Sequence, residues 1–320
     1  MAEYLIQEET LTGIADAIRS KTGSEEPIAV GDMAAQIEGI TGGDGGMLPA
    51  GLYFQPMSLR KPNDYSQAWC YLNGVRYVFT NASSSSGSLA NVYKMDDVAN
   101  TQTQVVSNTS TALGLANAGG LCYVEFNGKI HICGGDDKKH FAFNGTSLTA
   151  CAALPSSAYN MPMFVHDDKL KVYTYSNGAV YVWDEATDTW TLEATVLSSY
   201  NYINAYVVNG VPYFISSTKV YTYNGSTLTQ VGTCKSNSVK GCAIGDCIYY
   251  GASGSSGMPY SALKYDTKTN QETELGVIAP VYSGYSRFWD YNGQLALLSC
   301  DNNANYAVTN MLVHHIEATE

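Results

Sequence analysis

Charged residues are scarce in this sequence, and basic residues are the scarcest of them. Only 14% of the residues are charged, and 17 Lys and Arg stand against 29 Asp and Glu, which gives a formal net charge of -12. Such a chain as a whole repels a nucleic-acid backbone or an anionic membrane surface. The composition therefore argues against those partners and favours a neutral or cationic one, such as a polar glycan or a protein.

Histidines and catalytic motifs are also few. The strand pattern predicts that His131 points outward and that the adjacent His314 and His315 face opposite sides of one strand. No Gly-x-Ser-x-Gly turn, P-loop or His-Glu-x-x-His motif occurs, and GASGSSG at 251–257 lacks the lysine of a phosphate loop. We therefore expect no metal, no cofactor and no catalytic residue, and hence no enzyme. The sequence has five scattered histidines: His131, His140, His166, His314 and His315.

Long apolar runs are absent, so we expect no membrane-spanning segment. The opening MAEYLIQEET carries acidic groups where an export signal needs basic ones, which predicts that the chain is not exported by a signal peptide. The eight cysteines lie in apolar, strand-like runs, where reduced thiols pack as small hydrophobic side chains. Cys242 and Cys247 are too far apart for a Cys-x-x-Cys motif. Synthesis in a reducing cytoplasm is the expectation.

Glycine and tyrosine, by contrast, are abundant, with 30 Gly and 25 Tyr. Six times, an apolar strand is followed by a two-residue turn and a second apolar strand, as in YVEFNGKIHIC and AYVVNGVPYFI. Asn-Gly between apolar runs is a strong hairpin signal because both residues tolerate positive φ. The turns are Asn73-Gly74, Asn127-Gly128, Asp167-Asp168, Asn209-Gly210, Gly245-Asp246 and Asn292-Gly293.

A second hairpin follows the first in five of these units, as in VYVWDEATDTWTLEA. Four strands that recur about every 44 residues are typical of a propeller blade, so residues 51–320 are predicted to form an all-β domain, a β-propeller of about six blades. The last unit keeps its strands but lacks the second turn. The early segment GLYFQPMS at 51–58 is a candidate for its missing strand.

Parts of these units resemble Kelch repeats. Gly134-Gly135 after KIHIC, and the run of Trp183, Asp184, Thr187 and Trp190, together resemble the motifs of one Kelch blade. Tyr265-Asp266 with Thr269-Asn270 repeats the second part without its final Trp, and the Gly pair is missing elsewhere. The resemblance therefore implies degenerate Kelch-like repeats. The Asp-box motif of sialidase propellers does not occur.

Residues 1–41 differ from the rest, because their apolar residues recur at helical spacing. Two short amphipathic helices are predicted to form a hairpin that packs on a second copy or on another protein, and the Gly-rich linker at 42–50 follows. The residues expected to mediate attachment or oligomerisation are Leu11, Ile14, Ile18, Met33, Ile37 and Ile40.

The string LTGIADAIRSKTGSEEPIAVGDMAAQIEGI resembles a module found near the ends of tail and baseplate proteins of phages that infect Gram-positive bacteria. The resemblance covers about a tenth of the chain and implies attachment to other tail or baseplate proteins. An unrelated two-helix cap is the alternative. The matching residues are Ile14, Ala15, Ala17, Ile18, Arg19, Lys21, Thr22, Gly23, Ile28, Met33, Ala34 and Ile37.

A ligand-binding face is predicted where the connections between units are rich in Tyr, Ser and Asn, a mixture typical of paratopes. The alternative is that these tyrosines only pack between blades. The predicted ligand-binding residues are Tyr65, Tyr159, Tyr200, Tyr202, Tyr282, Tyr285, Arg287 and Trp289.

Together these features predict a receptor-binding protein of a phage tail or baseplate that recognises a host cell-surface glycan or protein. It would be made in the bacterial cytoplasm, become part of the virion or phage-like tail, and bind neither nucleic acid nor membrane; a homo-oligomer is compatible with the helical segment. A cytoplasmic Kelch-type adaptor and a glycan-active propeller enzyme are the alternatives.

Overall fold

The structure is a computed structural model. It describes residues 15–16, 19, 51–57, 65–81, 89–97, 99, 101–107, 122–133, 138–156, 162–197, 203–235, 237–253, 260–278, 287–300 and 308–316. The chain divides into two compact units, one of Met1–Gly51 with Ile316–Glu320 and the other of Leu52–His315. No helix among the described residues is long and apolar enough to cross a membrane.

The predicted helical hairpin at 1–41 falls almost entirely outside the described residues. Ala15, Asp16 and Arg19 are described, all three are helical, and the side chains of Asp16 and Arg19 form an ion pair. Leu11, Ile14, Ile18, Met33, Ile37 and Ile40 are not among the described residues, so their role in attachment stays a prediction. The linker at 42–50 also lies outside them.

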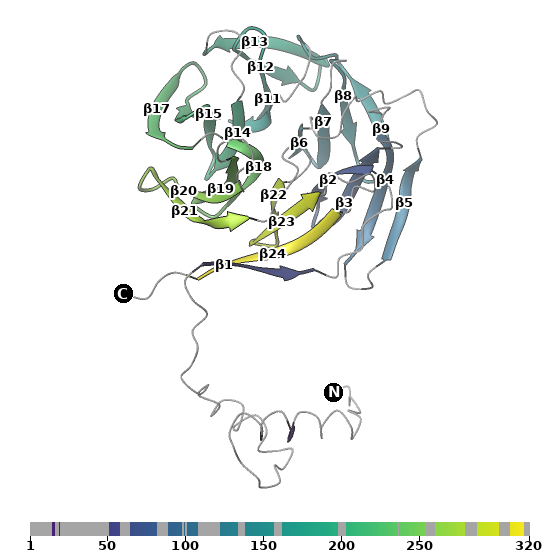
Figure 1. Cartoon of the computed structure of the whole chain (residues 1–320). Helices are drawn as coiled ribbons and strands as arrows, with labels where there is room; N and C mark the ends of the chain where they lie inside the picture. The colour runs from purple at the N-terminus through teal and green to yellow at the C-terminus, as the bar shows by residue number, and fades with distance from the viewer. Residues whose placement is uncertain are drawn as a thin grey trace, which may run out of the picture. The chain divides into compact units, whose positions relative to one another are not determined.

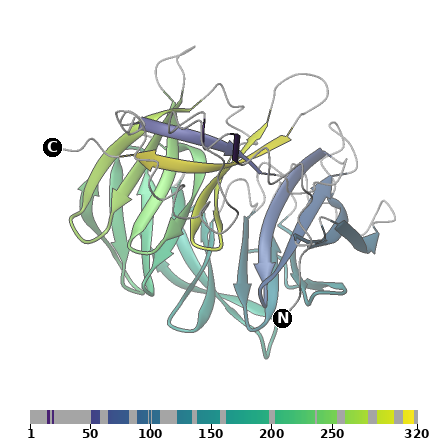
Figure 2. The ribbon, with the colours of Figure 1, turned by 90° about the horizontal axis from the view of Figure 1, so that it is seen from below.

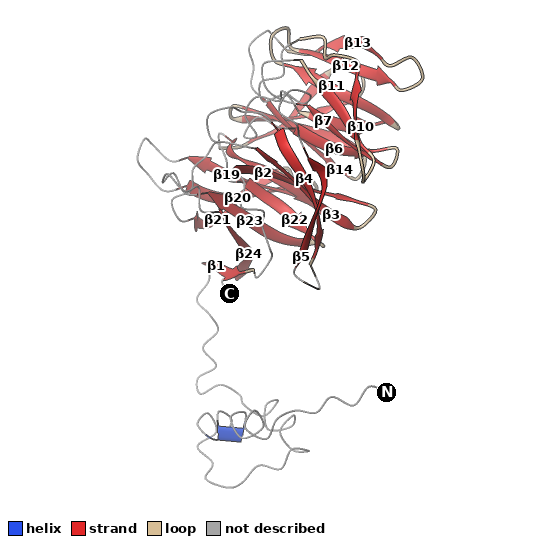
Figure 3. Cartoon of the chain, turned by 90° about the vertical axis from the view of Figure 1, so that its right-hand side faces the viewer, coloured by secondary structure: helices blue, strands red, loops and turns tan. Residues whose placement is uncertain are grey.

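The larger unit is built of antiparallel strands, and strands make up nearly all of its regular structure (Figure 3). Four separate sheets have four strands each. They are the sheet of β2 (Tyr65–Leu72), β3 (Val75–Asn81), β4 (Leu89–Asp96) and β5 (Thr101–Ser107); that of β6 (Cys122–Phe126), β7 (Lys129–Cys133), β8 (His140–Phe143) and β9 (Leu148–Cys151); that of β10 (Met163–His166), β11 (Lys169–Thr174), β12 (Ala179–Asp184) and β13 (Thr189–Thr195); and that of β14 (Ile203–Val208), β15 (Val211–Ser216), β16 (Lys219–Tyr223) and β17 (Leu228–Thr233).

The remaining strands form one eight-stranded sheet that has two halves. One half is β18 (Asn237–Ile244), β19 (Cys247–Ser253), β20 (Tyr260–Asp266) and β21 (Gln271–Ile278), and the other is β22 (Arg287–Tyr291), β23 (Gln294–Cys300), β24 (Val308–Ile316) and β1 (Gly51–Pro56). The halves meet where β18 and β22 run parallel and Lys240 pairs with Arg287. Each half therefore repeats the four-stranded pattern of the other sheets.

The two-residue turns of the first hairpins have the backbone that their residues predict. Asn127 and Gly128, for example, have φ of 48° and 68°, and Asn209 and Gly210 have 50° and 80°. Such turns match the twist of the flanking strands, and five of the six have positive φ at both positions, which Asn, Asp and Gly tolerate best; in Gly245-Asp246 only Gly245 does. The hairpins predicted from sequence are confirmed.

The turns of the second hairpins are stabilised in another way. An Asp or Asn side-chain oxygen just before the turn accepts hydrogen bonds from backbone N–H groups of the turn. Oδ1 of Asp184 accepts from the N–H of Ala186 at 2.9 Å, and Oδ1 of Asn224 accepts from the N–H of Thr227 at 2.9 Å. Asx turns of this kind stabilise the turn locally. Equivalent bonds are made by Asp96, Asn144 and Asp266.

Apolar clusters lie between successive sheets, so both faces of a sheet are covered. Phe79 of β3 packs with Phe143 of β8, and Phe164 of β10 packs with Phe214 of β15. The series closes on itself, because Trp289 of β22 packs with Val78 of the β2–β5 sheet. Figure 1 shows the resulting ring, with β5, β9, β13, β17 and β21 toward its rim. This arrangement is consistent with the predicted β-propeller.

The last sheet half is completed by the early segment, because β1 lies beside β24 (Figure 2). Leu52 and Phe54 of β1 pack against the cluster that holds Phe288, Leu297 and Val313. The proposal that residues near 51–58 supply the missing strand is therefore confirmed. Residues from the two ends of the propeller sequence thus share one sheet.

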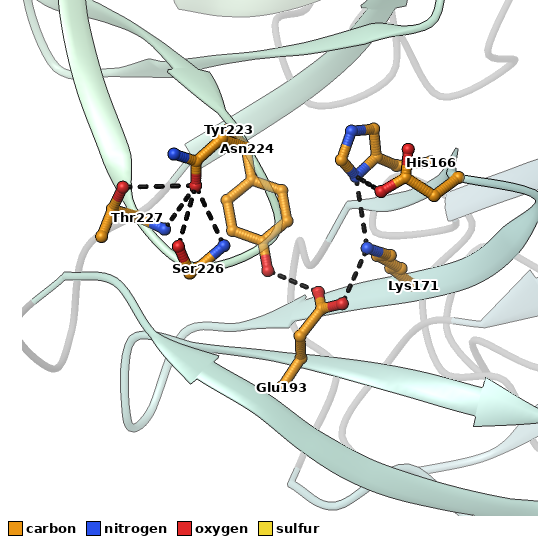
Figure 4. Close-up of polar contacts among 8 residues, drawn as sticks. His166, Lys171, Glu193, Tyr223, Asn224, Ser226 and Thr227 are labelled. Atoms are coloured by element: carbon orange, nitrogen blue, oxygen red, sulfur yellow. Dashed lines mark hydrogen bonds and ion pairs between the residues drawn. The ribbon is translucent and has the colours of Figure 1, made fainter.

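A buried ionic group links two neighbouring sheets (Figure 4). Lys171 of β11 is 1% exposed, and its Nζ donates to Oε1 of Glu193 at 2.8 Å and lies 3.2 Å from Nδ1 of His166. The hydroxyl of Tyr223, on β16 of the next sheet, donates to Oε2 of the same carboxylate. Glu193 therefore satisfies two donors that come from different sheets.

The cysteines whose side chains are described form no disulfide with one another. Burial raises the pKa of the Cys151 and Cys234 thiols to about 11, so both carry their protons at neutral pH. The structure agrees with the expectation that these cysteines are thiols.

Candidate functional site

The first strand of each four-stranded unit contributes to the wall of one cavity of about 330 Å³. These strands, β2, β6, β10, β14, β18 and β22, are called the inner strands here, and Figure 1 shows those that it labels near the middle of the ring. We name the hollow the inner-strand cavity. Its lining includes Tyr71, Tyr123, Asn204, Tyr206, Lys240 and Arg287.

Arg287 is the most deeply buried cation of this wall, with 5% of its surface exposed. Its guanidinium carbon lies 5.9 Å from the centroid of the Tyr123 ring, so it is held by an aromatic face from β6. Nε of Arg287 has no hydrogen-bond partner among the described residues. A buried donor that lines a cavity and lacks a partner is suited to a ligand that brings an acceptor.

Lys240 brings a second cation to the wall by means of a β-bulge. Between β18 and β19 the register shifts, so that Lys240 and Gly241 together face Tyr250. Burial lowers the pKa of the Lys240 ammonium. Of the two smaller effects, Cys122 raises this pKa and Arg287 lowers it further. The two cations are neighbours, since Lys240 and Arg287 are register partners across β18 and β22.

Gly241 makes this bulge possible, and we predict that alanine is not tolerated there. A Cβ at position 241 would overlap the carbonyl oxygen of Tyr249 and lie 2.9 Å from Cβ of Tyr250. Gly241→Ala should therefore lower the free energy of unfolding by about 2 kcal/mol, as overpacking does. Urea denaturation followed by tryptophan fluorescence measures the change.

The matched control is Gly210→Ala, where an added Cβ meets nothing within 4 Å but φ is +80°. Only the cost of the left-handed backbone applies there, about 1 kcal/mol. Equal losses for the two variants would show that crowding by Tyr249 is unimportant.

Aromatic side chains close another part of the wall. Trp289 is 4% exposed, stacks on Tyr71 at 6.5 Å between ring centroids, and meets the ring of Tyr291 edge-on at 5.5 Å. The acidic side chains of the wall, Glu125 and Asp290, are exposed, in contrast to the buried Arg287 and Trp289. The cations are thus held deep and the carboxylates lie nearer solvent.

The predicted ligand-binding residues divide into those the structure describes and those it does not. Arg287 and Trp289 both line the inner-strand cavity. Tyr65 begins β2, but its side chain is not described. The other predicted residues, Tyr159, Tyr200, Tyr202, Tyr282 and Tyr285, lie outside the described residues. Contact of any of the eight with a ligand stays a prediction.

Sequence reasoning did not single out Lys240, Tyr123 or Tyr206 as wall residues. Each is on an inner strand, and Tyr206 also accepts a hydrogen bond at its hydroxyl from the N–H of Gly241 at 3.1 Å. The available signal was positional, because the first strand of each four-stranded unit contributes to the cavity wall. The β-bulge that turns Lys240 toward the cavity leaves no comparable signal in the sequence.

The interpretation that the histidines are scattered is wrong for His131 and His140. They lie on the adjacent strands β7 and β8, with Nδ1 of His131 2.9 Å from Nε2 of His140. His131 is 0% exposed, so the prediction that it points outward also fails. The physical reason is that the β6–β9 sheet is covered on both faces by apolar clusters, so alternation along its strands does not imply exposure.

Both imidazoles are neutral at neutral pH. Burial, opposed by Glu185, lowers the pKa of His131 to about 4, and burial together with His131 lowers the pKa of His140 to about 3. Trp183 contacts both rings, with centroids 4.8 Å and 5.2 Å away. The pair is therefore an uncharged polar group in an aromatic environment.

Comparison with known proteins bears on the fold. No family model and no curated protein sequence matches the chain. Among solved structures, one described as "Structure of YjhT" is similar, with a TM-score of 0.59 and 11% sequence identity, and the match covers 81% of this chain and 97% of that one. At this level of identity the likeness concerns the fold alone.

Proposed function

We propose that this protein is a receptor-binding protein of the tail or baseplate of a phage or phage-like particle, and that it recognises a host cell-surface glycan or protein. The observation that carries the binding role is the inner-strand cavity, where Arg287 and Lys240 are held among aromatic side chains. The tail or baseplate assignment rests on the sequence resemblance of residues 1–41.

The scaffold in this proposal is a propeller of six Kelch-like blades. Its blades are the four separate sheets and the two halves of the eight-stranded sheet, with β1 as the outermost strand of the last. The Kelch-like residues agree with this assignment, because Asp184 supports its turn by accepting from the N–H of Thr187 and Trp183 donates to Asp188. A rigid scaffold of this kind suits loops that vary in length and composition.

Two of the Tyr-rich segments are adjacent in sequence to residues that line the cavity. Tyr202 directly precedes β14, whose Asn204 and Tyr206 line the cavity, and Tyr285 stands two residues before Arg287. In these two units the Tyr-rich segment is therefore close in sequence to residues of the cavity wall. Tyrosine offers broad contact area at low entropic cost, which favours binding by these segments.

The ligand that fits this wall presents hydrogen-bond acceptors to it. Nε of Arg287 is a buried donor, and the ammonium of Lys240 stands beside it in the register. A sugar hydroxyl or carboxylate, or a peptide carbonyl, can accept from such donors. The overall charge of -12 still disfavours polyanions, so the acceptor group would belong to a ligand that is not highly charged.

Several copies of the protein on one particle would make weak single-site binding sufficient, since linked sites multiply affinity. In the proposal the helices of residues 1–41 attach each copy to other tail or baseplate proteins, and the Gly-rich linker provides reach.

Attachment of purified protein to host cells tests the proposal. Tyr202→Ala, Tyr285→Ala and Arg287→Met are each expected to weaken attachment by about 1 to 3 kcal/mol where the residue is a hot spot. Trp289→Ala is also expected to weaken it, but its burial against Tyr71 means that this variant loses stability as well. Only variants whose melting temperatures match the parent are compared.

Asn209→Ala is the control on the turn side of the propeller. Nδ2 of Asn209 donates to Oδ1 of Asp246 at 2.7 Å, so the change should lower stability slightly and leave attachment intact. Normal attachment by all the well-folded Tyr and Arg287 variants would contradict the proposed binding face. Absence of tail and lysis genes beside the coding gene would instead favour a cytoplasmic adaptor.

A further inference from the structure

Three potential metal ligands from the β6–β9 sheet come together on one side of it. His131, His140 and Cys151 each offer an atom, and these atoms all lie within 4.8 Å of one another. The register explains this proximity, because His140 pairs with Cys151 across β8 and β9, while His131 pairs with Ala142 two residues further along β8. Side chains two residues apart share a face of a strand, so all three point the same way.

The surroundings of this group are apolar and aromatic. His131 is 0% exposed and His140 is 1% exposed, and the rings of Trp183 and Trp190 lie against them. Nε2 of His131 and Nδ1 of His140 have no hydrogen-bond partner among the described residues. The other two nitrogens, Nδ1 of His131 and Nε2 of His140, face one another 2.9 Å apart, and a bound ion would replace the hydrogen bond between them.

We propose that His131, His140 and Cys151 form a binding site for Cu⁺. The site is independent of the receptor-binding role proposed above, because it lies on β7, β8 and β9 and none of its residues lines the inner-strand cavity. Thiolate is the ligand that soft cations prefer, and imidazole binds copper in either oxidation state.

Charge and coordination number favour Cu⁺ over Zn²⁺. A thiolate and two neutral imidazoles neutralise a monovalent ion, so the buried site carries no net charge, whereas Zn²⁺ would leave one positive charge among tryptophans. Structural Zn²⁺ also requires four ligands, and three are present among the described residues. The aromatic rings add favourable contacts with a cation.

Binding changes protons but not oxidation state. Cys151 releases its thiol proton to solvent as sulfur binds the metal. The imidazole that donates in the hydrogen bond between His131 and His140 loses the proton of its facing nitrogen as the metal binds, and its other nitrogen takes up a proton, so that both facing nitrogens can bind Cu⁺. The intermediate exposure of Cys151 provides the side from which the ion enters.

The test is an anaerobic titration of the reduced full-length protein with Cu⁺ in competition with a chromophoric Cu⁺ chelator. We expect one Cu⁺ per chain, and we expect Cys151→Ser and His140→Gln each to weaken binding by more than about 100-fold, since even loss of an outer partner of a metal ligand costs 10- to 100-fold. X-ray absorption of the parent protein should show one sulfur and two nitrogen neighbours.

Cys234→Ser is the matched control. The Cys234 thiol follows the outer strand of another sheet and has its pKa raised to about 11 as Cys151 does, but it is outside the group. Its loss should leave Cu⁺ affinity unchanged. Failure to compete with the chelator, equal weakening by Cys234→Ser, a coordination shell of sulfur alone, or uptake of Zn²⁺ in preference to Cu⁺ would each overturn the proposal. The absorption measurement decides even if a variant fails to fold.

Discussion

Replacement of Glu193 by alanine is expected to lower the free energy of unfolding by about 3 kcal/mol. The ammonium of Lys171 is 1% exposed and loses the carboxylate that lies 2.8 Å away, and the hydroxyl of Tyr223 loses its acceptor. Removal of one partner of a buried ion pair typically costs 3 to 5 kcal/mol. We expect the lower end because the Glu193 side chain is 21% exposed. Equilibrium unfolding in urea measures the loss.

Glu185→Ala provides the control for that change. Glu185 pairs with Lys129 at 2.8 Å, but both side chains are 39% exposed, so water replaces the lost partner. An exposed pair of this kind contributes about 0 to 1 kcal/mol. The double variant Lys171→Met with Glu193→Leu should recover the part of the stability that the unpaired charge costs, since apolar residues of similar volume often replace a buried pair at little cost, while the Tyr223 hydroxyl still lacks its acceptor. A loss below about 1 kcal/mol for Glu193→Ala would mean that the charge of Lys171 is satisfied by other groups.

Deletion of residues 1–57 is expected to destabilise the propeller by about 5 kcal/mol, whereas deletion of residues 1–46 is expected to leave a monomeric, cooperatively folding domain. The longer deletion removes β1, and with it Leu52 and Phe54 from one apolar cluster and Met57 from another. Full burial of a Leu, Phe or Met side chain contributes about 1.5 to 3 kcal/mol. The deletion of residues 1–57 also leaves β24 as an unpaired edge strand, and such an edge promotes aggregation.

Thermal unfolding and light scattering compare the two deletions. The total stability of a domain is about 5 to 15 kcal/mol, so a loss of this size is a large fraction of it. A Leu52→Ala, Phe54→Ala double variant of the chain that lacks residues 1–46 keeps the backbone of β1 and separates the lost packing from the exposed edge. Insolubility after deletion of residues 1–46 would contradict the two-unit organisation. Equal stability of the two deletions would show that β1 is not part of the folded sheet.

Most of the local structure could be predicted from sequence because short-range rules determine it. Asn127-Gly128 and Asn209-Gly210 lie at turns with positive φ, as their small or polar side chains predict. The Asp184 side chain bonds to the N–H groups two and three residues ahead of it, so its effect also stays within the turn. Repetition of such local signals was enough to predict four-stranded units, and the early strand at 51–58 followed from the one unit that lacked a strand.

The contents of the candidate sites were decided by contacts between residues far apart in sequence. Nothing in the order of residues shows that Arg287 lies over the ring of Tyr123, or that a bulge at Gly241 turns Lys240 toward the cavity. The same holds for His131 and His140, which meet across two adjacent strands although His131 was predicted to point outward.

The sequence by itself therefore determined the hairpins, their repetition and the all-β class, because turn geometry and alternation depend on neighbouring residues. Only the tertiary structure decided which polar side chains meet, because packing of sheets against one another buries both faces of each strand. Once both faces are buried, the partner of a side chain such as His140 is set by register across β7, β8 and β9 and by Trp190 of the next sheet. These contacts depend on the closed ring and have no signature along the chain.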